Sequence, residues 1–295
     1  MAFSHRTIRS CVFLFKNIDI SGNKLIRFLL LTLCFLISAC GGSSSSEDSS
    51  DSTIVIPTVN SNTRWFLQLQ GTYDLSISTE LYELDLFDAQ TSQIATLKNN
   101  GIFVVCYFSA GSFEDWRDDA SSFNQTDIGQ ALDNWPGEYW LDIRSDNVRT
   151  VMKNRIQLAK SKGCDAVDPD NVDGFLQNTG FNITAGEQLA FNSYLANTAH
   201  SIGLAIGLKN DLTQTQTLEP LFDFAINEQC IANQECDYLA PFKASQKLII
   251  NIEYDTALIQ SDSAKSTLCT EAETMGMMTK VLTNALDGTE LYSCF

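Results

Sequence analysis

The chain has 295 residues, of which 44% are hydrophobic, and its 36 acidic and 19 basic residues give a net charge of −17. A surface of one sign repels polymers of the same sign, so this balance argues against nucleic acids and anionic polymers as partners and mildly favours cationic ones. Acidity that serves only solubility is an equally common explanation.

The first 39 residues are expected to be a signal peptide. Five basic residues and a single acid precede the apolar stretch 28–37, which is too short to span a membrane readily. Residues 37–40 read Ile-Ser-Ala-Cys and resemble the lipobox of bacterial lipoproteins. The resemblance implies that Cys40 is lipidated and that the exported chain is held at the cell envelope, outside the cytoplasm, by its lipid alone. Ordinary cleavage near Ala39 is the alternative.

The segment 41–52 has no apolar side chain to bury, so residues 40–62 are predicted to be a serine-rich, flexible tether. Residues 63–295, about 230 in number, suit one large domain, for which a barrel of alternating strands and helices has the right size. Removal of residues 1–39 takes away five basic and one acidic residue, leaves 14 and 35, and brings the net charge to −21. We expect a monomer.

Eight short apolar runs follow one another along this domain, and helical patterns such as 148–160 separate several of them. Eight strands with helices between them predict an α/β fold, a single (β/α)8 TIM barrel. The predicted strands are 65–69, 82–87, 102–108, 165–167, 204–208, 222–226, 248–252 and 277–282.

Six cysteines remain in the exported domain, where an oxidising compartment permits pairing. The polar stretch Cys230–Cys236 is typical of a loop closed by a disulfide, and Cys269–Cys294 is the second suggested pair. Cys106 and Cys164 lie in apolar runs and are predicted to be buried. Spacing alone leaves the connectivity open.

The mature chain has one histidine, His200, in a helical pattern just before the fifth strand. In a barrel this position lies opposite the usual active face, so His200 is predicted to be structural. A catalytic triad, a multi-histidine metal centre and a metal-dependent phosphodiesterase therefore fit poorly, and no metal or cofactor is expected.

Residues 168–174, Asp-Pro-Asp-Asn-Val-Asp-Gly, concentrate three carboxylates at the end of the fourth apolar run. A calcium-binding loop is the competing interpretation, but its twelfth position would be Thr179 instead of glutamate. Polar residues also follow neighbouring strands, and in a barrel these strand ends meet at one mouth. Without a histidine, two carboxylates are the natural catalytic pair, as in glycoside hydrolysis.

Eight segments in the same order together resemble glycoside hydrolase family 114, the endo-α-1,4-polygalactosaminidases. They are 68–74, 83–88, 106–112, 135–144, 163–174, 207–211, 227–230 and 252–254, and the resemblance runs from about residue 64 to the C-terminus. It implies a (β/α)8 barrel that cuts internal α-1,4 bonds in galactosamine-containing polymers. Such polymers are cationic when deacetylated, which agrees with the acidic charge of the chain.

Asp170, after the fourth strand, and Glu228, after the sixth, match the acidic positions that the family uses and are the predicted catalytic pair. The hypothesis is a retaining displacement with Asp170 as nucleophile and Glu228 as acid/base, with exchangeable roles. Asp168 shares the side-chain parity of Asp170, so it is expected one layer deeper, where it would tune the pKa of Asp170. Asp173 is expected to cap a turn, and Glu253 is the reserve acid.

The supporting residues are chosen for their location and their donors to sugar hydroxyls. Asp85, Asp142 and Glu253 are expected to pair with amino groups of the substrate; Arg144 is expected to steady an acid, and Arg117 is read as an ordinary loop charge. The predicted substrate-binding set is Tyr107, Asp168, Asn171, Lys209, Asn210, Gln229, Glu253 and Tyr254.

A second hypothesis keeps the barrel and drops the chemistry. The chain would then be a non-catalytic, lipid-tethered protein that binds a cationic exopolysaccharide at the cell surface. Loss of either Asp170 or Glu228 would favour this interpretation, and both residues are present.

Overall fold

The computed structural model describes residues 64–295. The predicted signal peptide 1–39, the lipidation site Cys40 and the tether 40–62 lie outside the described residues. In the part of the chain that is described, no helix is both long and apolar enough to cross a membrane.

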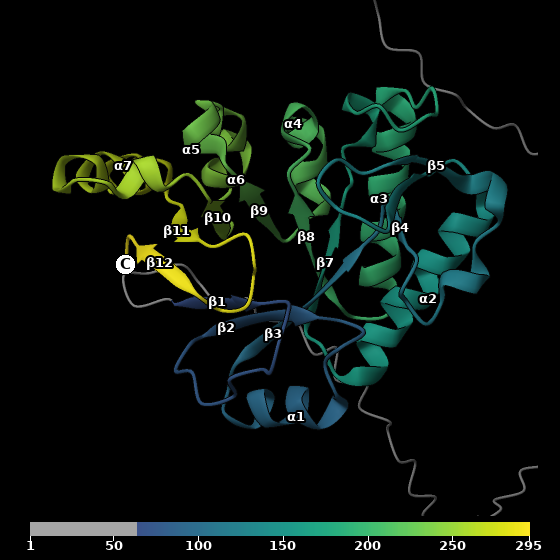
Figure 1. Cartoon of the computed structure of the whole chain (residues 1–295), viewed down its shortest axis with the longest axis horizontal. Helices are drawn as coiled ribbons and strands as arrows, with labels where there is room; N and C mark the ends of the chain where they lie inside the picture. Colours follow the sequence, from purple (N-terminus) through teal and green to yellow (C-terminus); the bar gives the residue numbers. More distant parts are fainter. Residues whose placement is uncertain (1–63) are drawn as a thin grey trace, which may run out of the picture. The chain divides into compact units, whose positions relative to one another are not determined.

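Within this range, one curled sheet of nine strands organises the chain (Figure 1), and its order is β1-β2-β3-β7-β8-β9-β10-β11-β12. All neighbours are parallel except β11 and β12, which are antiparallel. The parallel strands are β1 (Trp65–Gln68), β2 (Leu81–Asp85), β3 (Phe103–Ser109), β7 (Ala166–Asp170), β8 (Ala205–Lys209), β9 (Phe224–Glu228), β10 (Ile249–Glu253) and β11 (Met278–Leu282).

These eight strands coincide with the eight predicted runs, so the strand prediction is confirmed. Three strand ends were placed too early, because β7, β8 and β9 continue to Asp170, Lys209 and Glu228 and hold these residues within the strands. The two ends of the sheet also approach each other. The indole Nε1 of Trp65 in β1 donates to the carbonyl of Met278 in β11 at 3.0 Å, and the amide of Leu69 donates to the carbonyl of Leu286 at 2.8 Å.

A small antiparallel sheet between β3 and β7 was not foreseen. It has the order β4-β6-β5, and a segment of it lines the cavity described below. Its strands are β4 (Ser112–Glu114), β5 (Ile128–Ala131) and β6 (Glu138–Leu141), and β12 (Glu290–Ser293) ends the main sheet.

The helices lie outside the curled sheet (Figure 1). The longest begin at side-chain caps: Ser145 accepts from the amide of Asn147, and Thr184 forms a capping box with Glu187. His200 in α3 pairs with Asp223, which also accepts from the amide of Ile206, and this arrangement fits the structural role predicted for His200. The helices are α1 (Thr91–Asn99), α2 (Asp146–Lys162), α3 (Ala185–Ser201), α4 (Thr215–Leu218), α5 (Cys230–Asn233), α6 (Ala240–Ala244) and α7 (Asp262–Met275).

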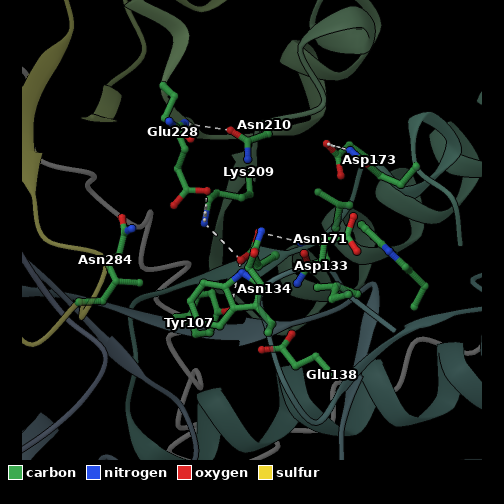
Figure 2. A pocket seen from close by; sticks show the side chains of 18 of the residues that line it. Tyr107, Asp133, Asn134, Glu138, Asn171, Asp173, Lys209, Asn210, Glu228 and Asn284 are labelled. Carbon is green, nitrogen blue, oxygen red and sulfur yellow. Dashed lines mark hydrogen bonds and ion pairs between the residues drawn. The ribbon is translucent and has the colours of Figure 1, made fainter. Parts of the chain in front are cut away.

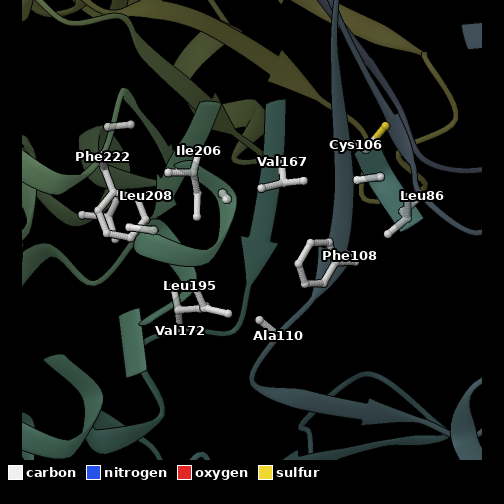
Figure 3. Close-up of a cluster of buried hydrophobic side chains, with 14 of the residues drawn as sticks. Leu86, Cys106, Phe108, Ala110, Val167, Val172, Leu195, Ile206, Leu208 and Phe222 are labelled. Atoms are coloured by element: carbon white, nitrogen blue, oxygen red, sulfur yellow. The ribbon is translucent and has the colours of Figure 1, made fainter. Parts of the chain in front are cut away.

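Alternation along the strands separates two apolar layers. Side chains such as Phe108, Val167 and Ile206 pack between sheet and helices (Figure 3), whereas Ala166 and Ala205, one residue before Val167 and Ile206, belong to the inner layer. Parallel strands buried on both faces explain the nearly continuous apolar runs of the sequence. The polar side chains with inward parity include Glu83, Tyr107, Asp168, Asp170, Lys209, Glu228 and Lys280.

Three disulfides join the described residues. Cys230–Cys236 and Cys269–Cys294 confirm the suggested pairs, and the two cysteines predicted only as buried form the third, Cys106–Cys164, between β3 and the start of β7. Disulfides of this kind fit an oxidising compartment, as expected for an exported domain.

Candidate active site

A cavity of about 870 Å³ opens at the carboxyl ends of the parallel strands (Figure 2). Each of these strands delivers its last residues to one edge of the sheet, which is also where parallel barrels place their active sites. The cavity brings together eight of the ten predicted catalytic and substrate-binding residues: Tyr107, Asp170, Asn171, Lys209, Asn210, Glu228, Gln229 and Tyr254.

Lys209 stands at the centre of the carboxyl groups. Its Nζ lies 3.4 Å from Asp170 Oδ2, 3.7 Å from Glu228 Oε2 and 3.9 Å from Asp168 Oδ2. Burial lowers the pKa of this ammonium, but the three carboxylates outweigh burial, so its pKa lies well above the ordinary value. We refer to Lys209 with Glu83, Asp168, Asp170 and Glu228 as the lysine cluster.

The two predicted catalytic carboxyls are each held by a tyrosine. Tyr107 donates its hydroxyl to Asp170 Oδ2 at 3.2 Å, and Tyr254 donates to Glu228 Oε1 at 2.6 Å. The backbone amide of Asn171 donates to Asp170 Oδ1 at 2.7 Å. Each carboxyl therefore has a defined orientation before any substrate arrives, which is the preorganisation that catalysis needs.

The spacing of the pair is limited by their common neighbour. Because Asp170 Oδ2 and Glu228 Oε2 lie 3.4 and 3.7 Å from the same nitrogen, they are at most about 7 Å apart, the sum of the two distances. Retaining glycosidases space their carboxyls roughly 5–5.5 Å apart and inverting ones roughly 6.5–9.5 Å. A separation of at most about 7 Å allows the whole retaining range but only the shortest inverting separations.

The residue that follows each of three cavity strands has a left-handed backbone. Asn171 after β7 has φ 60°, Asn210 after β8 has φ 49° and Gln229 after β9 has φ 64°. Non-glycine residues adopt this region at a cost, and such strain concentrates at functional sites. Here it turns the chain sharply after Asp170, Lys209 and Glu228. Asn210 also accepts from the amide of Glu228 at 2.9 Å, which links β8 to β9.

Asp168 lies beneath the cavity and does not line it. Asp168 therefore lies deeper than Asp170, as predicted. It does not reach the cavity surface, where a substrate would contact it. Glu83 of β2, which sequence reasoning did not select, reaches the cavity floor beside it. Burial raises the pKa of Asp168 to about 7, although Lys209 opposes the shift, and burial followed by the charge of Asp168 raises the pKa of Glu83 well above its ordinary value.

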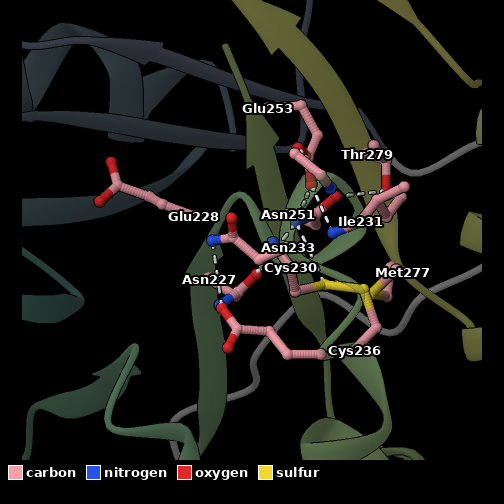
Figure 4. The surroundings of a disulfide bond; sticks show 12 residues. Asn227, Glu228, Cys230, Ile231, Asn233, Cys236, Asn251, Glu253, Met277 and Thr279 are labelled. Atoms are coloured by element: carbon pink, nitrogen blue, oxygen red, sulfur yellow. Dashed lines mark hydrogen bonds between the residues drawn. A yellow bond between two sulfur atoms is a disulfide. The ribbon is translucent and has the colours of Figure 1, made fainter. Parts of the chain in front are cut away.

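Glu253, the other predicted residue absent from the cavity lining, faces the helix side of β10. Its carboxylate accepts from the amides of Ile231 at 2.9 Å and Ala232 at 3.3 Å, so it holds the start of α5 beside the Cys230–Cys236 disulfide (Figure 4). The side chain of Glu228 extends away from this group. Ile250 and Ile252 occupy the inward positions of β10, and Glu253 has the opposite parity. The parity argument applied to Asp168 would have excluded it.

Three further predictions need correction. Asp85 pairs with the buried Arg117, which is no ordinary loop charge, and Asp142 pairs with Arg144, so neither acid is free for a substrate amino group. Asp173 makes no side-chain cap; it lines the cavity instead. The expectation that Arg144 steadies an acid is confirmed by its contact with Asp142 at 2.7 Å.

The small sheet and the loop between β5 and β6 add acids and an aromatic ring that the predicted site residues did not include. Glu138 of β6 lines the cavity, and burial raises its pKa to about 7 although Ser112 donates to it at 2.9 Å. Ser112 is joined to Ser109, and Asn171 donates to Ser109 at 2.9 Å, so hydrogen bonds connect Glu138 with the turn after Asp170. Asp133, Asn134 and Trp135 line the same wall. In residues 64–295, no three His, Cys, Asp or Glu side chains are arranged to hold a metal ion.

Comparisons with known proteins also indicate a glycoside hydrolase. Residues 44–294 match the sequence profile of the glycoside hydrolase family GH114. The crystal structure of Aspergillus fumigatus Ega3 in complex with galactosamine is similar, with a TM-score of 0.75 and 39% identity over 80% of this chain and 96% of that one. The glycoside hydrolase domain of PelA from Pseudomonas aeruginosa shares the fold, with a TM-score of 0.59 and 15% identity over 78% and 98%. No curated protein matches the chain significantly in sequence.

The site and these likenesses define a glycoside hydrolase. The chain belongs to glycoside hydrolase family GH114, so the resemblance seen in the sequence is confirmed.

Proposed function

We propose that this enzyme cleaves internal α-1,4 bonds in a cationic, galactosamine-containing polysaccharide, with Asp170 and Glu228 as its catalytic pair. The observation that carries the proposal is the placement of both carboxyls against one buried ammonium at the base of the cavity. Eight parallel strands, with β1 brought to β11 by Trp65, support a (β/α)8 barrel as the scaffold.

The chemistry follows a retaining displacement. Asp170 attacks the anomeric carbon while Glu228 gives its proton to the departing sugar oxygen, which forms a covalent glycosyl-enzyme. Glu228 then takes a proton from water, and the water oxygen displaces Asp170. The hydrogen bonds from Tyr107 and Tyr254 and the common limit on their spacing support this pair, and the roles of the two acids are exchangeable.

The charge of the cavity supports a cationic substrate. Its lining contains six carboxyl side chains and, among the described residues, one basic side chain, Lys209. An ammonium group on the sugar would reduce the repulsion among these acids. The galactosamine complex of Aspergillus fumigatus Ega3 supports this sugar in particular. The residues proposed to hold sugar hydroxyls are Tyr107, Asn171, Lys209, Asn210, Gln229 and Tyr254.

The test is incubation of the purified enzyme with partly deacetylated galactosaminogalactan, followed by mass spectrometry of released oligosaccharides. Internal cleavage is expected to give short oligomers early, and proton NMR of the first product is expected to show the α-anomer. Chitosan, which is cationic but built from β-linked glucosamine, separates recognition of charge from recognition of the sugar. Polymer binding by folded enzyme without any release would favour the non-catalytic binding protein.

We also propose that residues 1–39 are a lipoprotein signal and that Cys40 anchors a monomeric enzyme to the cell envelope through the tether 40–62. The sequence Ile-Ser-Ala-Cys at 37–40 carries this proposal. The full chain expressed in a bacterial host is expected to fractionate with membranes, and the C40S variant is expected to be released. Equal fractionation of the two chains would argue for simple cleavage near Ala39.

A further inference from the structure

The turn between β5 and β6 forms a wall of the cavity that the displacement mechanism does not use. Residues 130–135 and Glu138 line the cavity. Backbone hydrogen bonds close the turn: the amide of Leu132 donates to the carbonyl of Glu138 at 2.9 Å, and the amide of Glu138 donates to the carbonyl of Trp135 at 3.1 Å. A carboxyl at Glu138 and an indole ring at Trp135 are therefore presented to the cavity from one fixed piece of backbone.

Glu138 is a buried carboxyl with one oxygen that has no partner. The residue is 7% exposed, and its Oε2 accepts from the hydroxyl of Ser112 at 2.9 Å. Within residues 64–295, no other donor hydrogen-bonds to this carboxyl, and no Lys or Arg forms an ion pair with it. Because Glu138 lines the cavity, a bound ligand can reach Oε1. Buried charges are stable only with a partner, so this oxygen favours a ligand that brings positive charge.

The hydrogen-bond chain that reaches Glu138 has a fixed direction. Ser109 Oγ accepts from the amide of Ser112 at 3.1 Å and from Asn171 Nδ2 at 2.9 Å, so both of its lone pairs are used. The hydroxyl proton of Ser109 then points to Ser112 Oγ, and Ser112 gives its own proton to Glu138 Oε2. Oε2 is therefore an acceptor within the protein, which leaves Oε1 as the oxygen that meets a ligand.

Trp135 supplies an apolar surface on the same turn. It is 44% exposed, although it lines the cavity, whereas Trp140 of β6 is 9% exposed. Gly137 has a left-handed φ of 93°, and a Cβ at this position would lie 2.8 Å from the ring of Trp116, so that ring packs against the turn and supports it. A flat apolar ring with free surface suits the C–H face of a sugar ring.

Glu138 and Trp135 lie apart from the reacting carboxyls. In Figure 2 Glu138 stands below Tyr107, whereas Lys209 and Glu228 stand above it. Among the described residues, Lys209 makes no ion pair with Glu138. The turn therefore offers a second place for positive charge, away from the bond that is cleaved.

We propose that Glu138 and Trp135 form an amino-sugar subsite, which binds a galactosamine unit at a fixed distance along the polymer from the cleaved bond. The ammonium group of that unit donates to Glu138 Oε1, and its ring packs on Trp135. An N-acetyl group is bulkier and carries no charge, so the subsite selects a deacetylated unit. The identity of the sugar rests on the proposed function, and the subsite adds the place along the polymer where a free amine is required.

Binding of a deacetylated galactosamine pentamer tests the subsite without turnover. In an Asp170→Asn background, Glu138→Gln is expected to raise the Kd measured by calorimetry on the order of tenfold, because a neutral amide replaces a charge-assisted contact. Asp133→Asn is the matched control, since it removes an acid from the same turn at an exposed position on the cavity wall. Its effect is expected to be smaller, because water and salt screen an exposed charge. Equal Kd values for Glu138→Gln and Asp133→Asn would overturn the subsite.

The products of a partly deacetylated galactosaminogalactan locate the required amine along the chain. Tandem mass spectrometry of wild-type products is expected to find free galactosamine at one fixed position counted from the newly formed end. Glu138→Gln is expected to accept acetylated units at that position. The same positional preference in both enzymes would overturn the subsite.

Trp135 tests the apolar half of the subsite. Trp135→Ala is expected to raise KM on the order of tenfold with kcat nearly unchanged, because the contact lies away from the reacting bond, and Trp135→Phe is expected to restore part of the loss. A fall in kcat at constant KM would overturn the assignment. The two proposals fail separately: a weakened Kd in Glu138→Gln without any turnover by wild type would keep the subsite and end the proposed hydrolysis, whereas normal turnover with an unchanged Kd would do the reverse.

Discussion

Two buried clusters of charge lie close to the cavity edge, and they are balanced differently. The lysine cluster sets four carboxyls around one ammonium at 3.4–3.9 Å for the three it contacts. The second group, here called the arginine cluster, has two guanidinium groups with three acids and contacts of 2.6–2.8 Å at its closest pairs. The arginine cluster consists of Arg117, Arg155, Asp85, Glu114 and Asp119.

In the arginine cluster, every guanidinium nitrogen donates to a carboxylate or carbonyl oxygen. Arg117 donates to both carboxylate oxygens of Asp85 and to Glu114. Arg155 donates to both oxygens of Asp119 and to the carbonyl of Ser109, the last at 2.7 Å. Both guanidinium groups also lie over the ring of Phe87, at 4.8 and 4.9 Å. Such bidentate, stacked pairs hold β2, β4 and α2 in place.

The lysine cluster has the opposite character. Within the described residues the Lys209 ammonium makes ion pairs and no short hydrogen bond, so its N–H groups are available to a ligand. Excess negative charge in a buried site favours bound cations and protons over neutral partners. The comparison teaches that the cluster whose charges are nearly balanced serves the fold, whereas the cluster with a large excess of negative charge lies at the candidate active site.

The largest expected effect separates activity from stability. Asp170→Asn and Glu228→Gln each remove a carboxylate from the incompletely compensated cluster, so activity on the galactosamine polymer is expected to fall on the order of 10³-fold or more. Stability is expected to stay level or rise, because less negative charge is buried. Initial rates and thermal unfolding on the same preparations measure both. A loss of activity that only tracks a loss of folded protein would remove the assignment.

Arg117→Met is the corresponding change in the arginine cluster, and its expected effect is on folding. It leaves Asp85 buried without its cation and Glu114 with Arg155 alone, at 3.5 Å, which costs about 3–5 kcal/mol of unfolding free energy. Denaturant unfolding measures the loss. Arg144→Met is the control, since Arg144 is exposed at the surface and, among the described residues, its ion pairs are with Asp142 and Glu187. Similar losses in the two variants would mean that burial of the pair does not matter.

Lys209→Met removes the single ammonium of the lysine cluster. Without the ammonium, activity is expected to fall on the order of 10²-fold, the usual cost of one electrostatic partner in an active site. The remaining carboxyls are expected to take up protons, so the variant should match the wild-type Tm near pH 5 and fall below it at pH 8. A Tm difference that stays constant from pH 5 to pH 8 would show that Lys209 does not hold these groups ionised.

Much of the scaffold could be predicted from the sequence, because strands buried on both faces leave continuous apolar runs. The eight runs, the inward parity of Asp168 and Asp170 and the short disulfide loop Cys230–Cys236 all depend on local patterns of this kind. The catalytic role of Asp170 and Glu228 stays a prediction, although the structure brings both to one ammonium.

The missed features depend on contacts between distant segments. Arg117 lies in a loop, and the sequence does not reveal its role because its partner Asp85 lies on strand β2, 32 residues earlier. The small sheet β4-β6-β5 has short, partly polar strands that give no apolar run. Glu83 could have been found, because it shares the inward parity of Leu81 in β2, but nothing in the sequence shows that Asp168 lies beside it.

The smallest expected effect is at Asp211, a buried carboxyl outside the cavity. It tests whether a buried acid without a cationic partner also takes up a proton away from the candidate active site. This residue is 1% exposed, its Oδ2 accepts from Asn192 at 2.8 Å, and burial raises its pKa to about 8. The folded state therefore binds a proton that the unfolded state releases, so stability declines as pH rises from about 4 through about 8. Asn suits the left-handed φ of 44° and stays neutral. We expect Asp211→Asn to be more stable than wild type by about 1 kcal/mol at pH 8.5, with the gap closing by pH 5. A gap that is independent of pH would place Asp211 with the compensated, structural charges.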